Sequence, residues 1–283
     1  MTDARTLLRA AEERLQAGGV ASPRHDAAAL LAFVTGTQRS TVSLVEVTDQ
    51  QASDFDRLVD RRAAREPLQH LTGVAHFRYV ELAVGPGVFV PRPETELLAG
   101  WAIEIASQIE ASGRAPIVAD LCTGSGAIAK SVAHEVPTAV VHAIELDEDA
   151  LRWAERNLAD TGVRLVQGDL ATAFPDLDGT VDVVVCNPPY IPLEAWESVA
   201  AEARDHDPHL ALFSGQDGLD AMRSLEATAR RLLKPGGVAG AEHADVQGES
   251  APAVFSASGE WTDVRDHPDF NGRPRFLTAR LAR

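Results

Sequence analysis

The chain has 283 residues, a length that favours one large domain beside a small one, and its formal net charge is −16. A protein with this negative charge repels a phosphate backbone unless it carries a local basic groove. We therefore expect no stable nucleic-acid partner. No apolar run approaches the roughly 18 residues of a membrane span, and the N-terminus lacks the basic and apolar regions of a signal peptide, so we expect a cytoplasmic protein without a membrane partner.

The N-terminal region is typical of a small helical bundle. Amphipathic periodicity predicts helices over residues 3–17, 24–35 and 49–65. Gly18-Gly19 would stop the first helix, and Ser22-Pro23 would start the second.

The densest basic group of the chain lies in this region, at helical spacing: Arg57, Arg61, Arg62 and Arg65. Two interpretations remain open. The group is either a solvated helix face or a contact surface for a partner protein that is acidic or binds RNA.

A connecting segment follows the bundle. Residues 79–84 and 88–90 flank Gly85-Pro86-Gly87, which predicts a β-hairpin, and Pro93 would start a helix over 94–109.

From Pro116 onward strands and helices alternate, which predicts an α/β fold with a doubly wound, mostly parallel sheet. A helix over 219–233 would lead through the turn 234–237 to a strand over 238–242. Residues 261–266 and 275–281 would form a last, antiparallel strand pair.

Only two cysteines occur, Cys122 and Cys186, both at the ends of predicted strands and without metal-ligand spacing. They indicate structural thiols in a reducing compartment, close together if the two strands are neighbours. The histidines show no metal spacing either, so no metal site is predicted.

A Gly-rich turn follows the predicted strand 117–121. Gly124 and Gly126 would let the backbone turn tightly and approach a ligand closely, before a helix over 127–136. The third glycine of a dinucleotide fingerprint is replaced by Ala129, so a dinucleotide fold is not favoured.

Acids follow the next two strands. Glu145 ends the strand 140–145 and could accept hydrogen bonds from both ribose hydroxyls of a nucleoside. Asp169, after the strand 164–166, would either reach an adenine amine or cap a turn.

The most informative stretch is Asn187-Pro188-Pro189-Tyr190, which follows the apolar run 181–186. The prolines must break the strand at the sheet edge where α/β folds bind ligands. There the Asn187 carboxamide and the Pro188 carbonyl could accept two hydrogen bonds from one planar –NH2 group, with Tyr190 as an apolar wall. A proline turn after a core strand is the plainer alternative. The order Gly-rich loop, acid, Asp, Asn-Pro-Pro-Tyr is that of an adenosylmethionine-dependent methyltransferase.

Four further stretches make a resemblance specific. They match the family patterns R-x-P-L-Q-Y-I-x-G, I-P-R-P-E-T-E, E-P-x-x-A-L…G-x-D-G-L and E-H, and they are residues 65–73, 89–96, 207–220 and 242–243. With them the whole chain resembles the HemK family, the glutamine methyltransferases of peptide chain release factors. Cys122 stands where the family usually has Gly, Asp207 where it often has Glu, and Leu170 where some members have an aromatic residue.

The resemblance implies a seven-stranded methyltransferase sheet and methyl transfer from S-adenosyl-L-methionine to the glutamine of a Gly-Gly-Gln motif, with S-adenosyl-L-homocysteine as the product. We expect a monomer with an N-terminal docking domain (1–72), a hairpin linker (73–92) and a catalytic domain (93–283). The expected catalytic residues are Asn187, Pro188, Pro189 and Tyr190. The expected cofactor-binding residues are Asp120, Cys122, Thr123, Gly124, Ser125, Gly126, Glu145, Asp169, Leu170, Asn187, Arg92 and Glu94.

Arg92 would pair with the methionyl carboxylate or with a neighbouring acid, and Asp120 would hold the Gly-rich loop or the methionyl amino group. Two other functions remain possible. A ribosomal-protein glutamine methyltransferase belongs to the same superfamily, although its relatives tend to carry P-R-S-P-I where this chain has residues 91–95. A DNA or RNA amino-methyltransferase could hold a base amine with the same tetrapeptide, but it would need a basic groove.

Overall fold

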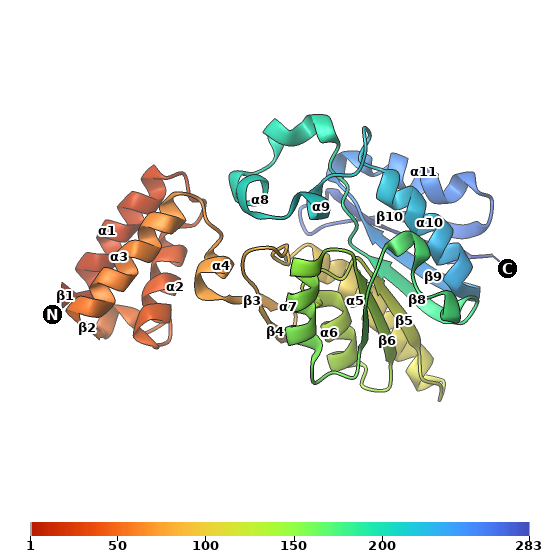
Figure 1. The fold of residues 1–283 in the computed structure, drawn as a ribbon, viewed down its shortest axis with the longest axis horizontal. Helices are drawn as coiled ribbons and strands as arrows, with labels where there is room; N and C mark the ends of the chain where they lie inside the picture. Colours follow the sequence, from red (N-terminus) through yellow and green to blue (C-terminus); the bar gives the residue numbers. More distant parts are fainter. Residues whose placement is uncertain (1, 283) are drawn as a thin grey trace. The chain divides into compact units, whose positions relative to one another are not determined.

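The computed structural model describes residues 2–282 (Figure 1). It divides into two compact units, which we describe separately. The helical unit takes in the chain up to Val74 together with residues 84–86 and 200–206, and the sheet unit contains residues 75–83, 87–199 and 207–283. No helix within residues 2–282 is long and apolar enough to cross a membrane.

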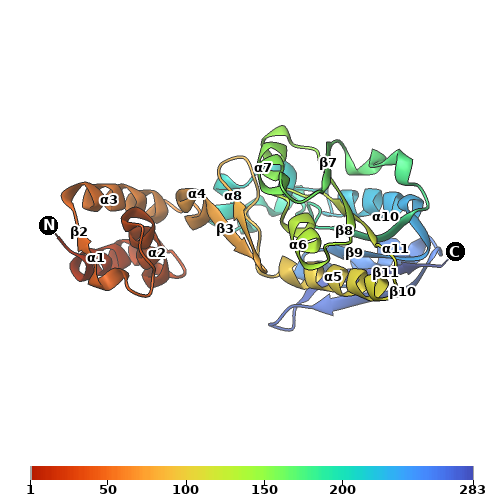
Figure 2. The same cartoon turned by 90° about the horizontal axis from the view of Figure 1, so that it is seen from below.

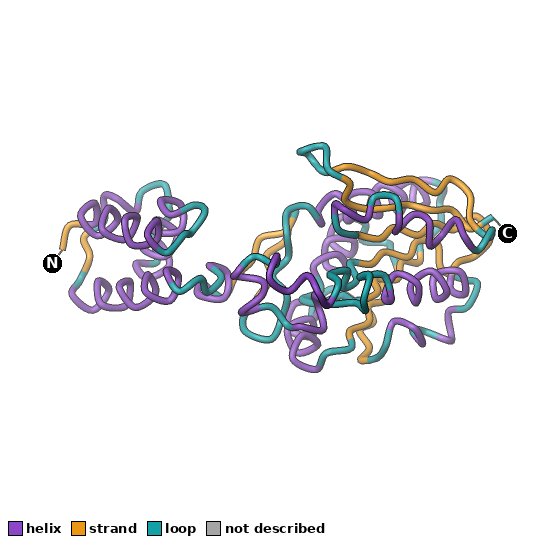
Figure 3. The backbone as a smooth tube through the Cα atoms, turned by 90° about the horizontal axis from the view of Figure 1, so that it is seen from above, coloured by secondary structure: helices purple, strands orange, loops and turns teal. Residues whose placement is uncertain are grey.

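The helical unit consists mainly of helices (Figure 3). Its helices are α1 (Ala4–Ala17), α2 (Pro23–Thr35), α3 (Asp49–Ala63), α4 (Leu68–Thr72) and α8 (Ala201–His206). The Asp3 carboxylate caps α1, and Thr48 with Gln51 forms a capping box at the start of α3. The three predicted helices are therefore confirmed, with ends displaced by no more than two residues. Apolar faces meet in one core, which includes Leu15, Leu30, Leu31 and Phe55.

Two short elements complete this unit. The strands β1 (Thr2–Asp3) and β2 (Glu46–Val47) pair antiparallel, and the 3-10 turn η1 (Val42–Leu44) precedes β2.

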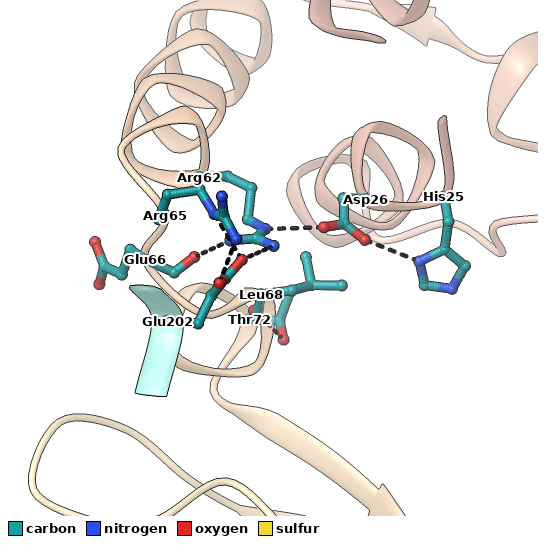
Figure 4. A network of polar contacts seen from close by, with 8 residues as sticks. All are labelled: His25, Asp26, Arg62, Arg65, Glu66, Leu68, Thr72 and Glu202. Atoms are coloured by element: carbon teal, nitrogen blue, oxygen red, sulfur yellow. Dashed lines mark hydrogen bonds and ion pairs between the residues drawn. The ribbon is translucent and has the colours of Figure 1, made fainter. Parts of the chain in front are cut away.

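The arginine group is not an open basic surface. Arg62 is buried, and its Nε donates to Asp26 at 2.8 Å while its Nη2 donates to Glu202 of α8 at 3.0 Å (Figure 4). The Arg65 Nε donates to the same Glu202 carboxylate at 2.8 Å. Burial raises the pKa of Glu202, but the hydrogen bonds from the two arginines outweigh burial and lower it to about 2.

The other two arginines of the group are also paired. Arg61 lies against Glu66, and Arg57 against Asp54. A fully solvated helix face is therefore wrong, because Arg62 is buried, whereas a contact surface for a partner protein stays a prediction for the exposed Arg57 and Arg61.

The connecting hairpin lies earlier in the chain than the sequence suggested. It is formed by β3 (Val74–Phe77) and β4 (Val80–Ala83), and residues 88–90 form no strand, although Val88 and Val90 are buried. The predicted strand 79–84 is confirmed as β4, whereas the predicted strand 88–90 and the hairpin turn at Gly85-Pro86-Gly87 are wrong. The turn falls at Arg78, whose φ is 50°. At the end of β4, the Asn157 carboxamide accepts a hydrogen bond from the Ala83 N–H and donates one to the Ala83 carbonyl.

The sheet unit contains seven strands in the order β10-β11-β9-β8-β5-β6-β7. In chain order they are β5 (Ile117–Leu121), β6 (Val140–Glu145), β7 (Arg164–Gln167), β8 (Val181–Cys186), β9 (Leu233–Glu242), β10 (Trp261–Pro268) and β11 (Pro274–Leu281). Strands β5 to β9 pair in parallel, whereas β11 is antiparallel to both β9 and β10. The predicted seven-stranded, mostly parallel sheet with a final antiparallel pair is confirmed.

One strand starts earlier than expected. Residues 234–237, predicted as a turn, belong to β9, although the register between β8 and β9 is irregular there.

Helices cover both faces of this sheet (Figure 2). They are α5 (Thr95–Ala111), α6 (Ala127–Glu135), α7 (Glu148–Leu158), α10 (Asp220–Leu232) and α11 (Ser250–Ala257). Alternate residues of β9 show the two layers, because side chains of a strand alternate between faces. Ala239 and Ala241 share a core with α10 and α11, while a Cβ on Gly240 would lie 2.4 Å from the Trp101 ring of α5. The sheet is therefore doubly wound, and its parallel strands all end at one edge.

Candidate active site

A cavity of about 430 Å³ lies at the carboxyl ends of the parallel strands, a size typical of small-molecule sites. Neighbouring strand ends face each other there, with Leu121 of β5 opposite both Ile144 of β6 and Cys186 of β8. Ten residues of the predicted site line this cavity: Cys122, Thr123, Gly124, Ser125, Glu145, Asp169, Leu170, Asn187, Pro189 and Tyr190.

The side chain of Asp120 holds the Gly-rich loop by hydrogen bonds. Its Oδ2 accepts hydrogen bonds from the Thr123 hydroxyl at 2.6 Å and from the Ala129 N–H at 3.0 Å. Asp120 is fully buried, and burial raises its pKa to about 7 against the effect of these hydrogen bonds. Of the two roles expected for Asp120, the structure shows the hold on the loop.

The two glycines of the loop serve different needs. Gly124 lines the cavity at φ 57°, and a Cβ there would meet no atom within 4 Å, so its backbone is open to a ligand. Gly126 has φ 85° and faces the core instead, where a Cβ would lie 3.0 Å from the Leu158 side chain.

Cys122 stands one residue after β5 with φ 63°, in the left-handed region that a side chain disfavours. Its thiol lies close enough to Cys186, at the end of the neighbouring strand β8, to affect that thiol's pKa, and both cysteines are free. Burial, followed by this contact, raises the pKa of Cys186.

Glu145 ends β6 and is buried. Its Oε2 accepts from the Gly124 N–H at 2.7 Å and its Oε1 from the Asp147 N–H at 2.9 Å. Burial raises the pKa of Glu145, and the backbone hydrogen bonds oppose that shift. The carboxylate thus braces the Gly-rich loop while still facing the cavity.

Asp169 and Leu170 follow β7 and line the cavity. The Asp169 Oδ1 accepts from the Ala171 N–H at 2.8 Å and so caps the 3-10 turn η2 (Leu170–Thr172). The alternative of a turn cap therefore holds, and both residues also line the cavity.

Asn187 follows β8 and is connected to a buried polar chain. Its Nδ2 donates to the Thr95 hydroxyl at 3.3 Å, and Thr95 in turn donates to the Glu242 Oε2 at 2.7 Å. The Tyr190 hydroxyl donates to the other oxygen of Glu242 at 3.1 Å. Pro188 is buried and does not line the cavity, whereas Pro189 does.

Arg92 and Glu94 do not line the cavity. The Arg92 Nη2 donates to Asp207 at 2.6 Å, and its guanidinium lies over the Phe89 ring at 4.9 Å from the centroid. Burial raises the pKa of Asp207 to about 6, although Arg92 opposes the shift. Of the two partners considered for Arg92, the neighbouring acid is the one that the structure shows, and Glu94 stands at the N-cap of α5.

Part of the lining was not predicted from the sequence, chiefly apolar residues from five separate segments: Phe89, Ile128, Ile144, Ile191, Leu210 and Phe213. The motif match at 89–96 and 207–220 pointed to two of these segments, but an apolar side chain has no chemical signature of its own. Thr95 also lines the cavity and was overlooked inside the same motif.

Relatives of known description decide the family. A model of the PrmC N-terminal domain matches residues 6–73, and a methyltransferase-domain model matches residues 118–206. A release factor glutamine methyltransferase of Streptomyces coelicolor is 58% identical over 272 residues, which cover 96% of each chain. A protein of the same description from Mycolicibacterium smegmatis is 45% identical over the whole of both chains.

The chain belongs to the release factor glutamine methyltransferases. The resemblance drawn from the motifs is thereby confirmed, as is the dependence on S-adenosyl-L-methionine that this family implies.

A further relative has a different description. The 4-amino-L-phenylalanine/4-methylamino-L-phenylalanine methyltransferase of Streptomyces pristinaespiralis is 47% identical over 218 residues, which cover 77% of this chain and 74% of that one. Its sequence identity to this chain is close to that of the Mycolicibacterium smegmatis relative. Sequence identity alone therefore does not decide between a release factor and an amino acid as the substrate.

The residues present fit the cofactor of this family. The Gly124 backbone is open on the cavity side, and the buried Asp120 Oδ1 has no hydrogen-bond partner within residues 2–282. Across this same part of the chain, no group of three or more His, Cys, Asp or Glu side chains is arranged to hold a metal ion.

Proposed function

We propose that this release factor glutamine methyltransferase transfers the methyl group of S-adenosyl-L-methionine to the side-chain amide nitrogen of the glutamine in a Gly-Gly-Gln motif of a peptide chain release factor. S-adenosyl-L-homocysteine is the second product. The observation that carries the chemistry is the state of Asn187: it lines the cavity while its nitrogen is engaged by Thr95, which leaves its oxygen as an acceptor.

The chemical difficulty is the weak nucleophilicity of an amide nitrogen, whose lone pair is delocalised into the carbonyl. The Asn187 Oδ1 and the Pro188 carbonyl would accept the two N–H bonds of the substrate and favour a pyramidal nitrogen aimed at the methyl group. Such hydrogen bonds strengthen in the transition state, and one can contribute about 3 kcal/mol. When bound, the cofactor supplies a methyl group activated by a positively charged sulfur.

The remaining residues of the proposed site would bind the cofactor and enclose the glutamine side chain. Pro189 and Tyr190 would form the apolar wall for the glutamine side chain, Glu145 would bind the ribose, and Asp169 would reach the adenine amine. The loop from Cys122 to Gly126 would pass beneath the cofactor, held by Asp120. Leu170 would supply the apolar contact that an aromatic residue makes in some relatives. We leave Arg92 and Glu94 out of this site, because Arg92 pairs with Asp207 and Glu94 stands at the N-cap of α5.

A division of labour completes the proposal. Residues 1–72 would dock the release factor, residues 73–92 would link the two parts, and residues 93–283 would perform the transfer. A remote contact of this kind supplies binding energy that orients the amide. We also propose that the enzyme acts as a monomer in the cytoplasm, where its substrate takes part in translation.

A truncation tests the docking role. Deleting residues 1–72 should leave adenosylmethionine binding nearly intact by calorimetry, while methylation of whole release factor falls sharply. A short peptide that carries the glutamine should be a poor substrate for both forms. If the truncated protein folds and methylates intact release factor at the full-length rate, the docking role is wrong.

One experiment tests the function as a whole. The protein is incubated with labelled S-adenosyl-L-methionine and, in parallel, a release factor, ribosomal proteins and DNA, and the methyl group is mapped by mass spectrometry. We expect label only on the glutamine of the release factor, and Asn187→Ala serves as the inactive control. Label on a ribosomal protein or on a base amine instead would reject the proposal.

A second candidate function rests on the Streptomyces pristinaespiralis relative. An aromatic amine, like an amide, presents a planar –NH2 that Asn187 and Pro188 could hold. Adding 4-amino-L-phenylalanine as a further arm of the same experiment separates the two, because N-methylation of this amino acid at a rate above that of the release factor would favour the second function.

A further inference from the structure

Behind Asn187 lies a buried polar chain, formed by Thr95 and Glu242, and the proposed function assigns no role to Glu242. Thr95 at the start of α5 and Glu242 at the end of β9 lie between Asn187 and Tyr190 and connect them by three hydrogen bonds of 3.3, 2.7 and 3.1 Å. Glu242 is 2% exposed and Thr95 4%, so the two middle groups of the chain are buried.

The direction of each hydrogen bond follows from the chemistry of the groups. An ionised carboxylate can only accept, so both the Thr95 and the Tyr190 hydroxyls must donate to Glu242. A threonine hydroxyl has a single hydrogen, and Thr95 has used its own. Towards Asn187 it can therefore only accept, and the group of Asn187 that meets it must be the –NH2.

We propose that Thr95 and Glu242 are positioning residues that fix the orientation of the Asn187 carboxamide, so that its oxygen faces the substrate amine. In the opposite orientation the Asn187 –NH2 would face the substrate –NH2, and two donors cannot form a hydrogen bond. The inference deepens the proposed function and rests on it, because it assigns how the amide clamp is kept in its working state.

Protonation of Glu242 would reverse this order. A neutral carboxyl can donate to Thr95, whose hydrogen is then free to point at Asn187 and to favour the opposite amide orientation. The charged and titratable groups that face Glu242 are Arg275 of β11, Tyr190, and Glu94 at the N-cap of α5. Burial raises the pKa of Glu242 above its usual value, while the hydrogen bond from Thr95, the charge of Arg275 and the hydrogen bond from Tyr190 oppose the shift.

The first test compares two substitutions of one residue. Thr95→Val keeps the shape and removes the acceptor, whereas Thr95→Ser keeps the hydroxyl. We expect Thr95→Val to lower kcat on the release factor by about 10- to 100-fold, with KM for both substrates and the melting temperature little changed. Thr95→Ser should recover most of the lost kcat. A Thr95→Val enzyme with the wild-type kcat, or a Thr95→Ser enzyme as slow as Thr95→Val, overturns the proposal.

The second test uses pH and does not depend on whether Thr95→Val folds. Wild-type kcat should fall on the acid side as Glu242 takes up a proton, with a midpoint above the usual pKa of a glutamate. In Glu242→Gln, which has no carboxyl to titrate, that acid limb should disappear and kcat should be lower at neutral pH. An acid limb unchanged in Glu242→Gln overturns the proposal. If the wild-type enzyme fails to methylate the release factor at all, the proposed function is at fault rather than the positioning role.

Discussion

Acidic side chains around the cavity behave in the opposite way to Glu202 of the helical unit. In the helical unit, Glu202 is held by two arginines and its pKa falls to about 2. Around the cavity, Asp120, Glu145 and Glu242 are buried with hydrogen bonds in place of ion pairs, and burial raises the pKa of each of them.

This contrast separates two uses of charge. Paired charges such as those of Arg62 and Asp26 fix helices to one another, because each side chain loses a partner if its helix moves. Buried carboxylates without a cation retain lone pairs for a ligand, at the cost of desolvation. We therefore expect substitutions in the helical unit to change stability and those around the cavity to change chemistry and binding.

The largest effect expected around the cavity is that of Asn187→Ala. Loss of the acceptor oxygen should raise the barrier to methyl transfer by roughly 2–4 kcal/mol, with cofactor affinity little changed. Steady-state kinetics and calorimetry measure the two quantities. Asn187→Asp keeps an acceptor but adds a charge, so its activity should be reduced and not abolished. Turnover near the wild-type value in Asn187→Ala would refute the amide clamp.

In the helical unit the matching substitution is Arg62→Ala. It leaves Asp26 buried without its guanidinium, which should lower the free energy of unfolding by about 3 kcal/mol. The matched control is Arg57→Ala, whose exposed ion pair with Asp54 should contribute less than about 1 kcal/mol. Both are measured by denaturant unfolding. A change in cofactor affinity in Arg62→Ala without a change in stability would contradict the separation of the two uses.

Glu145→Ala should weaken adenosylmethionine binding by about 1–3 kcal/mol. The carboxylate contributes twice, through the ribose hydroxyls and through the Gly124 N–H that it holds in the loop. Glu145→Gln keeps one acceptor oxygen and should lose less. Calorimetry that shows the wild-type affinity for Glu145→Ala would remove this residue from the site.

The free energy of unfolding should depend on pH with opposite signs through Glu202 and through Asp120. Glu202 has a lowered pKa in the folded state, so its contribution is present above about pH 4.5 and is lost as pH falls towards 2. Asp120 has a raised pKa, so the folded state binds the extra proton and stability falls as pH rises from about 4 to about 7. Unfolding curves of Asp120→Asn across this range should lose the second slope. If stability still falls with pH in Asp120→Asn as it does in the wild type, another group causes this pH dependence.

The smallest effect is expected at Cys122. Its backbone lies in the left-handed region, so Cys122→Gly removes strain, but it also adds freedom to the unfolded chain. The two effects oppose each other, and the free energy of unfolding should change by less than about 1 kcal/mol. Cys122→Val keeps the strain and adds a branched side chain, and it should be clearly less stable.

Local signals predicted the fold because they act locally. Apolar periodicity and capping residues placed α1, α2 and α3 within two residues of their observed ends. The hairpin was misplaced because Gly85-Pro86-Gly87 is a strong turn signal, whereas the actual turn at Arg78 carries no such residue. The hairpin is also held at the end of β4 by Asn157, 74 residues away along the chain.

The site was predicted as far as its residues carry recognisable chemistry. The strand-end motifs predicted ten of the residues that line the cavity, and the buried partners behind them could not be found in the same way. Thr95 and Glu242 are 147 residues apart, and Arg62 and Glu202 are 140 apart. Pairs at such separations meet only through the topology of the whole chain.

The Asn157 carboxamide also has a consequence for how this protein is assembled. This one side chain, near the end of α7, donates to the carbonyls of Ala83 and Ser125 and accepts from the Ala83 N–H. It thereby joins the hairpin, a helix and the Gly-rich loop. Closing a chain segment of this length costs entropy before any contact forms, so we expect the hairpin to dock late during folding. The Gly-rich loop would then gain its last support only when this step is complete.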